Sequence, residues 1–97
     1  MITNRRTVQV KQGHMEAYTA MILAEAKNSV DPGRFRLYAS DVGPLNQLVL
    51  EIDFADLAAY ERFWRDWVSV DPILVFQQKY SALVDHNISS EIWDLTT

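Results

Sequence analysis

The chain has 97 residues and a mass of 11.2 kDa, which suits one domain over residues 1–97 because domains commonly run to about 100 to 150 residues. Its net charge of −4 includes no run of like charge, which argues against nucleic acid or an anionic membrane as partner. The absence of cysteine excludes disulfides, thiolate catalysis and cysteine-ligated zinc. The longest apolar run, residues 20–24, is too short to cross a bilayer, so we expect a cytoplasmic protein.

The first half of the chain predicts three strands and one helix. Residues 6–11 alternate between apolar and polar side chains, as in a half-buried strand. From 14 to 28 apolar residues recur at helical spacing, and Asp31-Pro32-Gly33 ends that helix because proline disfavours helix at the residue before it. Residues 34–40 and 47–54 alternate again and predict a hairpin.

The second half predicts two helices and a final strand. Asp56 can cap a helix that continues to residue 68, because its side chain can accept backbone N–H bonds of the first turn. Asp71-Pro72 begins another helix, which we expect to reach residue 84, since proline suits the first helical position. Residues 88–95 alternate imperfectly and predict the last strand.

The resulting order, β-α-β-β-α-α-β, predicts a ferredoxin-like α+β fold with a four-stranded antiparallel sheet. Its crossover connections share one right-handed sense, so all helices are expected on one face of the sheet. The other face then has no covering element in this chain. We expect it to carry the side chains of Thr7, Gln9, Lys11, Arg34, Arg36, Tyr38, Gln47, Val49 and Glu51. A second copy of the chain would cover this face.

Four short motifs mark the starts of these elements. They are Lys11-Gln12-Gly13 before a helix with Glu16 and Tyr18, Gly43-Pro44-Leu45-Asn46-Gln47 before a strand, residues 54–61, and Asp71-Pro72 before a helix. Together, over roughly residues 8–95, they resemble the NIPSNAP family. NIPSNAP-like proteins belong with the dimeric α+β barrels, which include antibiotic biosynthesis monooxygenases and haem-degrading monooxygenases. The resemblance implies a homodimer with two sheets packed face to face, and no established molecular function.

Two titratable residues of the first helix are candidate catalytic groups. Glu25 shares the apolar stripe with Tyr18, itself a candidate ligand contact. A carboxylate that faces a core is costly unless it is paired, and such groups are often tuned acids or bases. His14 lies near the same line and is the second candidate base. The alternative is that Glu25 reaches water at the helix end and that His14 is exposed in the first turn.

An aromatic band on the helix after Asp56 contains Tyr60, Phe63, Trp64 and Trp67. Rings of this kind bury about 150 to 250 Å² each, so they can simply fill the core. Alternatively, as the monooxygenase relatives suggest, they wall a cavity for a planar aromatic ligand. In that case Tyr60, Trp64 and Trp67 are the ligand contacts.

Arg36 and Tyr38 are candidate ligand contacts on the uncovered sheet face. The guanidinium fork suits planar anions, so Arg36 could clamp a carboxylate or phenolate inside the barrel. The alternative is an interface role, in which Arg36 pairs with Glu51 on the neighbouring strand.

No metal site is expected, because the two histidines lie far apart and lack zinc-type spacing. No phosphate-binding glycine motif occurs either. We expect no cofactor; haem is the one group for which the resemblance leaves room. Three functions remain: binding of a small aromatic or acidic metabolite, cofactor-independent monooxygenation of the antibiotic biosynthesis type, and a solid barrel that serves as an interaction protein without a ligand.

Overall fold

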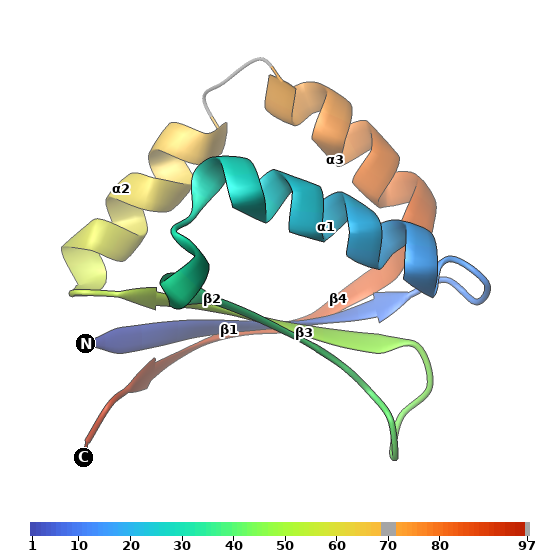
Figure 1. Ribbon diagram of the computed structural model, residues 1–97, viewed down its shortest axis with the longest axis horizontal. Coiled ribbons are helices and arrows are strands. Elements are labelled where there is room, and N and C mark those ends of the chain that lie inside the picture. Colours follow the sequence, from blue (N-terminus) through green and yellow to red (C-terminus); the bar gives the residue numbers. More distant parts are fainter. Residues whose placement is uncertain (69–71, 97) are drawn as a thin grey trace.

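The computed structural model describes residues 1–68 and 72–96. Its strands and helices follow one another in the predicted order (Figure 1). They are β1 (Ile2–Val10), α1 (Met15–Ser29), β2 (Phe35–Ala39), β3 (Gln47–Phe54), α2 (Leu57–Val68), α3 (Pro72–Leu83) and β4 (Val84–Asp94), with the 3₁₀ turn η1 (Pro32–Arg34) before β2. None of the described helices is both long and apolar enough to cross a membrane.

The sheet has the strand order β2-β3-β1-β4, and every neighbouring pair is antiparallel. Figure 1 shows α1, α2 and α3 together on one side of this sheet. These are two interleaved β-α-β units, whose right-handed crossovers bring the helices to the same face. The predicted ferredoxin-like α+β fold is therefore confirmed. So is the expectation that no described element covers the opposite face, which we call the open face.

Local sequence signals produce the predicted turns and helix starts. Gly13 has a φ of +84°, which residues with a Cβ rarely adopt, and the chain turns there between β1 and α1. The Asp56 carboxylate caps α2, because its Oδ1 accepts a hydrogen bond of 2.8 Å from the backbone N–H of Ala59. The predicted cap of α3, Asp71, lies outside the described residues.

The predicted side-chain parity of β2 and β3 is confirmed by their register. Leu37 pairs with Leu50 on the helix side, and Arg36 pairs with Glu51 on the open face. Alternation from these pairs places the following side chains on the open face: Thr3, Arg5, Thr7, Gln9, Arg36, Tyr38, Gln47, Val49, Glu51, Asp53, Ser89, Glu91 and Trp93.

Two residues predicted on the open face lie elsewhere. Arg34 belongs to η1, where its Nε donates a 2.9 Å hydrogen bond to the backbone oxygen of Asp53. Lys11 follows the last residue of β1, and its backbone N–H bonds the carbonyl of Leu83 at 2.9 Å. In both cases the strand boundary at that end lies one residue inside the boundary that the alternation of polar and apolar residues predicted.

Strand β1 begins at Ile2, earlier than the predicted start at residue 6. Its inward positions there are Asn4 and Arg6, whose polar side chains interrupt the apolar pattern. Asn4 is nevertheless only 1% exposed. Its Nδ2 donates hydrogen bonds to Ser90 Oγ at 3.3 Å and to the backbone oxygen of Glu91 at 2.9 Å, which compensates for part of the cost of burying the amide.

Strand β4 begins at Val84, not at residue 88, and Val84 pairs with Val10 of β1. The β1–β4 register shifts twice, once between Thr7 and Val8 and once before Val10. Such irregularities interrupt the period of two. This explains why the sequence of the last strand alternates imperfectly and why its start was missed.

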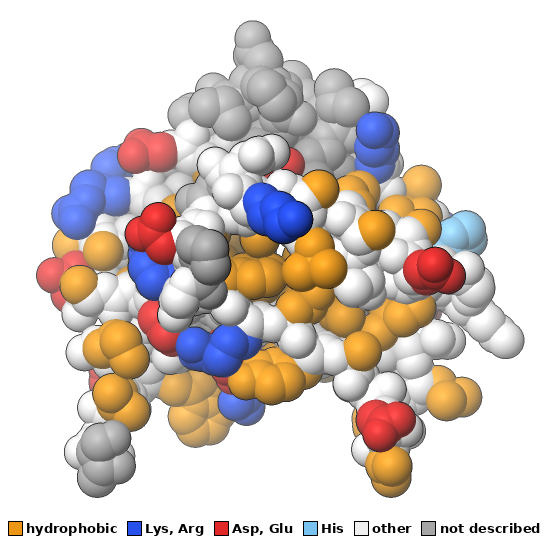
Figure 2. Space-filling view, viewed as in Figure 1, with side chains coloured by type: hydrophobic (Ala, Val, Ile, Leu, Met, Phe, Trp, Pro, Cys, Tyr) orange, Lys and Arg blue, Asp and Glu red, His pale blue; other side chains and the backbone are white. Residues whose placement is uncertain are grey.

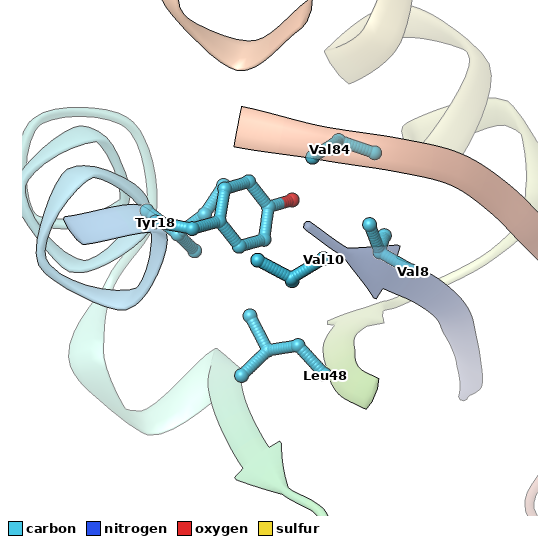
Figure 3. Packing of buried hydrophobic residues seen from close by; sticks show 6 residues of the cluster. Val8, Val10, Tyr18, Leu48 and Val84 are labelled. Atoms are coloured by element: carbon cyan, nitrogen blue, oxygen red, sulfur yellow. The ribbon is translucent and has the colours of Figure 1, made fainter. Parts of the chain in front are cut away.

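The core between sheet and helices consists of two clusters of buried side chains. The first contains Val8, Val10, Tyr18, Ile22, Leu48 and Val84. Figure 3 shows the Tyr18 ring of α1 facing this cluster, close to Val10 and with Leu48 and Val84 around it. The second contains Ile2, Val30, Ile52 and Phe54. Members of both clusters line a cavity within the layer.

Candidate functional site

A cavity of about 500 Å³ lies between the helical layer and the sheet. All four strands and all three helices contribute to its lining, so the cavity exists only once the whole fold has formed. Figure 2 shows hydrophobic side chains across the middle of the molecule, with charged side chains mostly around them. The lining is likewise mainly apolar, with a few polar groups, which is the usual composition of a small-molecule site.

Aromatic rings of α2 form one wall of this cavity. Phe63, Trp64 and Trp67 all line it. They pack edge to face, with ring centroids 5.1 Å apart for Phe63 and Trp64 and 5.5 Å apart for Trp64 and Trp67, which is a favoured geometry for aromatic pairs. Tyr60, the fourth ring of the predicted band, is outside the lining and packs on Phe54 at 5.6 Å.

Tyr18 contributes a buried hydroxyl on the opposite side, from α1. The residue is 2% exposed, and its ring meets that of Tyr80 edge to face at 5.4 Å. Burial, reinforced by the neighbouring Tyr80 hydroxyl, raises the pKa of Tyr18. Its hydroxyl therefore stays protonated near neutral pH. The Tyr80 hydroxyl in turn donates a hydrogen bond to Asn87 Oδ1.

The two candidate catalytic residues of α1 are not brought together. Glu25 is half-buried and lines the same cavity as Tyr18, two helical turns before it, and its neighbour Ala26. His14 stands at the N-terminal end of α1, exposed and outside the lining. Of the residues proposed from the sequence, the structure assembles Tyr18, Glu25, Trp64 and Trp67 around one space.

Arg6 is a cavity residue that was not among those expected from the sequence. Arg6 lines the cavity from β1, and its guanidinium carbon lies 4.1 Å from the centre of the Trp64 ring. Its Nε is buried and has no hydrogen-bond partner among the residues that the structure describes. A signal was available: the alternation of Val8 and Val10, continued towards the N-terminus, places Arg6 on the same inward side.

Arg36 and Tyr38 lie on the open face, away from this cavity. Three Arg36 nitrogens donate hydrogen bonds to carboxylates: Nε bonds Glu51 Oε1 at 3.0 Å, and Nη1 and Nη2 bond the two oxygens of Asp53 at 2.8 and 2.7 Å. Glu51 also accepts a 2.8 Å bond from Arg5 Nε. The pairing of Arg36 with Glu51, which the sequence offered as the alternative to a ligand clamp, is thus present.

This open-face network shifts the titration of its carboxylates. Hydrogen bonding from Arg36 lowers the pKa of Asp53 to about 2, against the effect of burial, and Thr3 contributes a further 2.7 Å hydrogen bond. Burial would raise the pKa of Glu51, but the hydrogen bonds from Arg5 and Arg36 outweigh it, and the pKa is lowered.

We expect the fold to lose stability in acid through Asp53. A carboxylate whose folded-state pKa is depressed from 3.8 to about 2 stabilises the fold above its unfolded-state pKa and loses that contribution as the pH falls towards 2. The loss is about 2 kcal/mol. Urea unfolding between pH 5 and pH 2 measures it. Asp53→Asn should flatten this pH dependence, whereas Asp41→Asn, in the exposed loop before β3, should not; equal slopes for both variants would contradict the assignment.

Comparison with known proteins supports the fold. No known family model matches the chain, and no curated protein matches it. A NIPSNAP family protein from Agrobacterium tumefaciens has 20% identity and a TM-score of 0.85, with 98% of this chain and 92% of the other covered. An uncharacterised NIPSNAP-like domain protein from Burkholderia xenovorans has 19% identity and a TM-score of 0.86, with 99% and 85% covered.

A solved antibiotic biosynthesis monooxygenase is also similar, with 10% identity, a TM-score of 0.73 and full coverage of both chains. The resemblance to NIPSNAP proteins that the sequence motifs indicated is therefore matched in three dimensions. At these identities the similarity is one of architecture. The chain has the ferredoxin-like fold that NIPSNAP family proteins share with antibiotic biosynthesis monooxygenases.

Proposed function

We propose that the protein binds a small, planar aromatic molecule in the cavity between its helices and its sheet. The observation that carries this proposal is the space itself, about 500 Å³ walled by Trp64 and Trp67. Ligand sites commonly measure about 300 to 1,000 Å³, whereas a chain that serves only as a packed interaction module needs no such space. The cavity therefore favours ligand binding over the solid barrel.

The same proposal includes a homodimer formed through the open face. On that face Tyr38 is 49% and Trp93 53% exposed. Two arginines and two carboxylates of the network neutralise one another within each chain, so a second copy can cover them without burying an unpaired charge. A self-neutral network beside exposed rings suits an isologous contact, in which both copies present the same surface.

Filling the cavity tests the binding proposal. Ala26 of α1 lines the cavity, whereas Ala24 of the same helix is exposed and outside the lining. Ala26→Phe should weaken binding of the neutral aromatic probe 2-naphthamide at least about tenfold, because the new ring occupies the ligand's volume. Ala24→Phe should leave the affinity unchanged. Isothermal titration calorimetry measures both, and equal affinities for the two variants would refute binding in this cavity.

A second candidate is a cofactor-independent monooxygenase, which the position of Glu25 in the aromatic-walled cavity favours. A base at this position could take the hydroxyl proton of a phenolic substrate. The electron-rich ring would then react with molecular oxygen. One oxygen atom replaces the hydrogen on the ring carbon opposite the hydroxyl, giving a quinone, and the other leaves as water. Oxygen consumption with 1-naphthol tests this candidate.

The cavity does not fit haem. Iron in haem is usually held by histidine, cysteine, methionine or tyrosine. Among the described residues that line the cavity there is no histidine or methionine, and the chain has no cysteine. The phenol groups of Tyr18 and Tyr80 interact with each other, and Tyr80 also bonds Asn87. We therefore propose that the ligand is held without a cofactor.

A further inference from the structure

Arg6 contributes a guanidinium to the cavity wall, and no carboxylate is paired with it among the residues that the structure describes. The buried Nε has no acceptor within the described residues. Buried polar groups in proteins are normally hydrogen-bonded, so this half-buried residue with a buried, unpartnered donor suits an anionic ligand that brings an acceptor.

The other arginines of the sheet show the contrast. Arg5 is paired with Glu51, and Arg36 is paired with both Glu51 and Asp53. All four side chains lie on the open face, away from the cavity. Arg6, in contrast, lies on the helix side of the sheet. No carboxylate among the described residues forms an ion pair with it.

The contact between Arg6 and Trp64 leaves N–H groups of the guanidinium able to bind a planar anion. Its guanidinium carbon lies 4.1 Å from the Trp64 ring centre, and such a contact uses the π-face of the ring rather than any N–H donor of the guanidinium. The guanidinium thus keeps N–H donors for an oxyanion, and a carboxylate matches their fork. Trp64 Nε1, also buried, is a further donor with no partner among the described residues. The wall therefore has donors in excess and suits a ligand that brings acceptors.

We propose that Arg6 is the anion-binding residue of the cavity and that the ligand is an aromatic carboxylate. The carboxylate pairs with the Arg6 guanidinium, and the ring occupies the apolar space beside Phe63 and Trp67. This inference rests on the proposed function, because it names the chemical class of the molecule bound in the same cavity.

Two probes of equal shape test the inference. In calorimetric titrations of the full chain at pH 7, 2-naphthoate should bind at least about tenfold more tightly than 2-naphthamide, since only the former is an anion. Arg6→Gln should remove this preference and retain 2-naphthamide binding. Arg62→Gln, with the same charge change on the exposed side of α2, should keep the preference. Arg6→Lys, which retains the charge, should lose several-fold in 2-naphthoate affinity and bind 2-naphthamide as before.

The possible outcomes distinguish the proposed binding in the cavity from the proposed role of Arg6 in binding a carboxylate. Equal binding of both probes by the wild type would overturn the assignment of an aromatic carboxylate, while binding in the cavity stands. A preference that survives both Arg6→Gln and Arg6→Lys would overturn the role of Arg6. Absence of binding by either probe would overturn the proposed function and this inference with it. Circular dichroism of each variant shows that it is folded, and the Arg6→Lys result decides the role of Arg6 if Arg6→Gln does not fold.

Discussion

If the proposed homodimer forms through the open face, replacing Tyr38 with aspartate is expected to separate it into monomers. Tyr38 lies on β2, on the open face, and is 49% exposed in the single chain. In an isologous dimer each substitution occurs twice, so two carboxylates would be buried without partners. At about 2 kcal/mol for each, the dissociation constant should rise roughly a thousandfold.

Sedimentation at micromolar concentration measures this change. Wild type should sediment at twice the chain mass of 11.2 kDa, and Tyr38→Asp at that mass itself. Ala58→Asp adds the same charge at an exposed position of α2, on the helical side, and should remain dimeric. A wild type that sediments as a single chain, or an Ala58→Asp variant that dissociates equally, would show that the open face is not the interface.

Replacing Glu25 with glutamine is expected to lower oxygen consumption with 1-naphthol at least about a hundredfold, if the monooxygenase candidate holds, because general base catalysis commonly contributes that much. Glutamine retains the size of the side chain and cannot accept the proton at the same position. The half-buried Glu25 should therefore keep its packing, and the loss should be in turnover and not in the affinity for the substrate.

The matched control is Glu16→Gln. Glu16 is in the first turn of the same helix and exposed, so its loss should leave turnover unchanged. Equal turnover of the Glu25→Gln variant and the wild type would remove Glu25 as the base. Wild type that consumes no oxygen with 1-naphthol would contradict the monooxygenase candidate and leave ligand binding as the function.

The strands of the hairpin were predictable because their alternation is regular. In β2 and β3 the inward residues are apolar throughout, and the register that pairs Leu37 with Leu50 directs them all to the helix side. Where polar groups occupy inward positions the pattern is lost, as at Asn4 and Arg6 of β1. The two register shifts between β1 and β4 remove it for the last strand. Prediction was therefore weakest for β1 and β4, whose boundaries depend on their pairing with each other across the whole length of the chain.

For the candidate site, the sequence indicated which residue types could form a cavity wall better than it indicated which side chains would pair with one another. Trp64 and Trp67 were identified by size and helical spacing, and both line the cavity. The pairing of Arg36 with Glu51 was offered from the sequence, whereas its further bonds to both oxygens of Asp53 appear only in the structure. Such pairing depends on distances between side chains that are far apart in the sequence.

The sequence by itself determined the order of the elements, the face of the sheet that the helices cover and the bare face opposite, because these follow from local periodicity and from the handedness of crossover connections. Only the tertiary structure decided that a cavity of about 500 Å³ remains between the layers and that Arg6 stands in its wall without a carboxylate partner in the described chain. The physical reason is that empty volume and charge pairing are properties of side chains from all seven strands and helices taken together, which no local pattern contains.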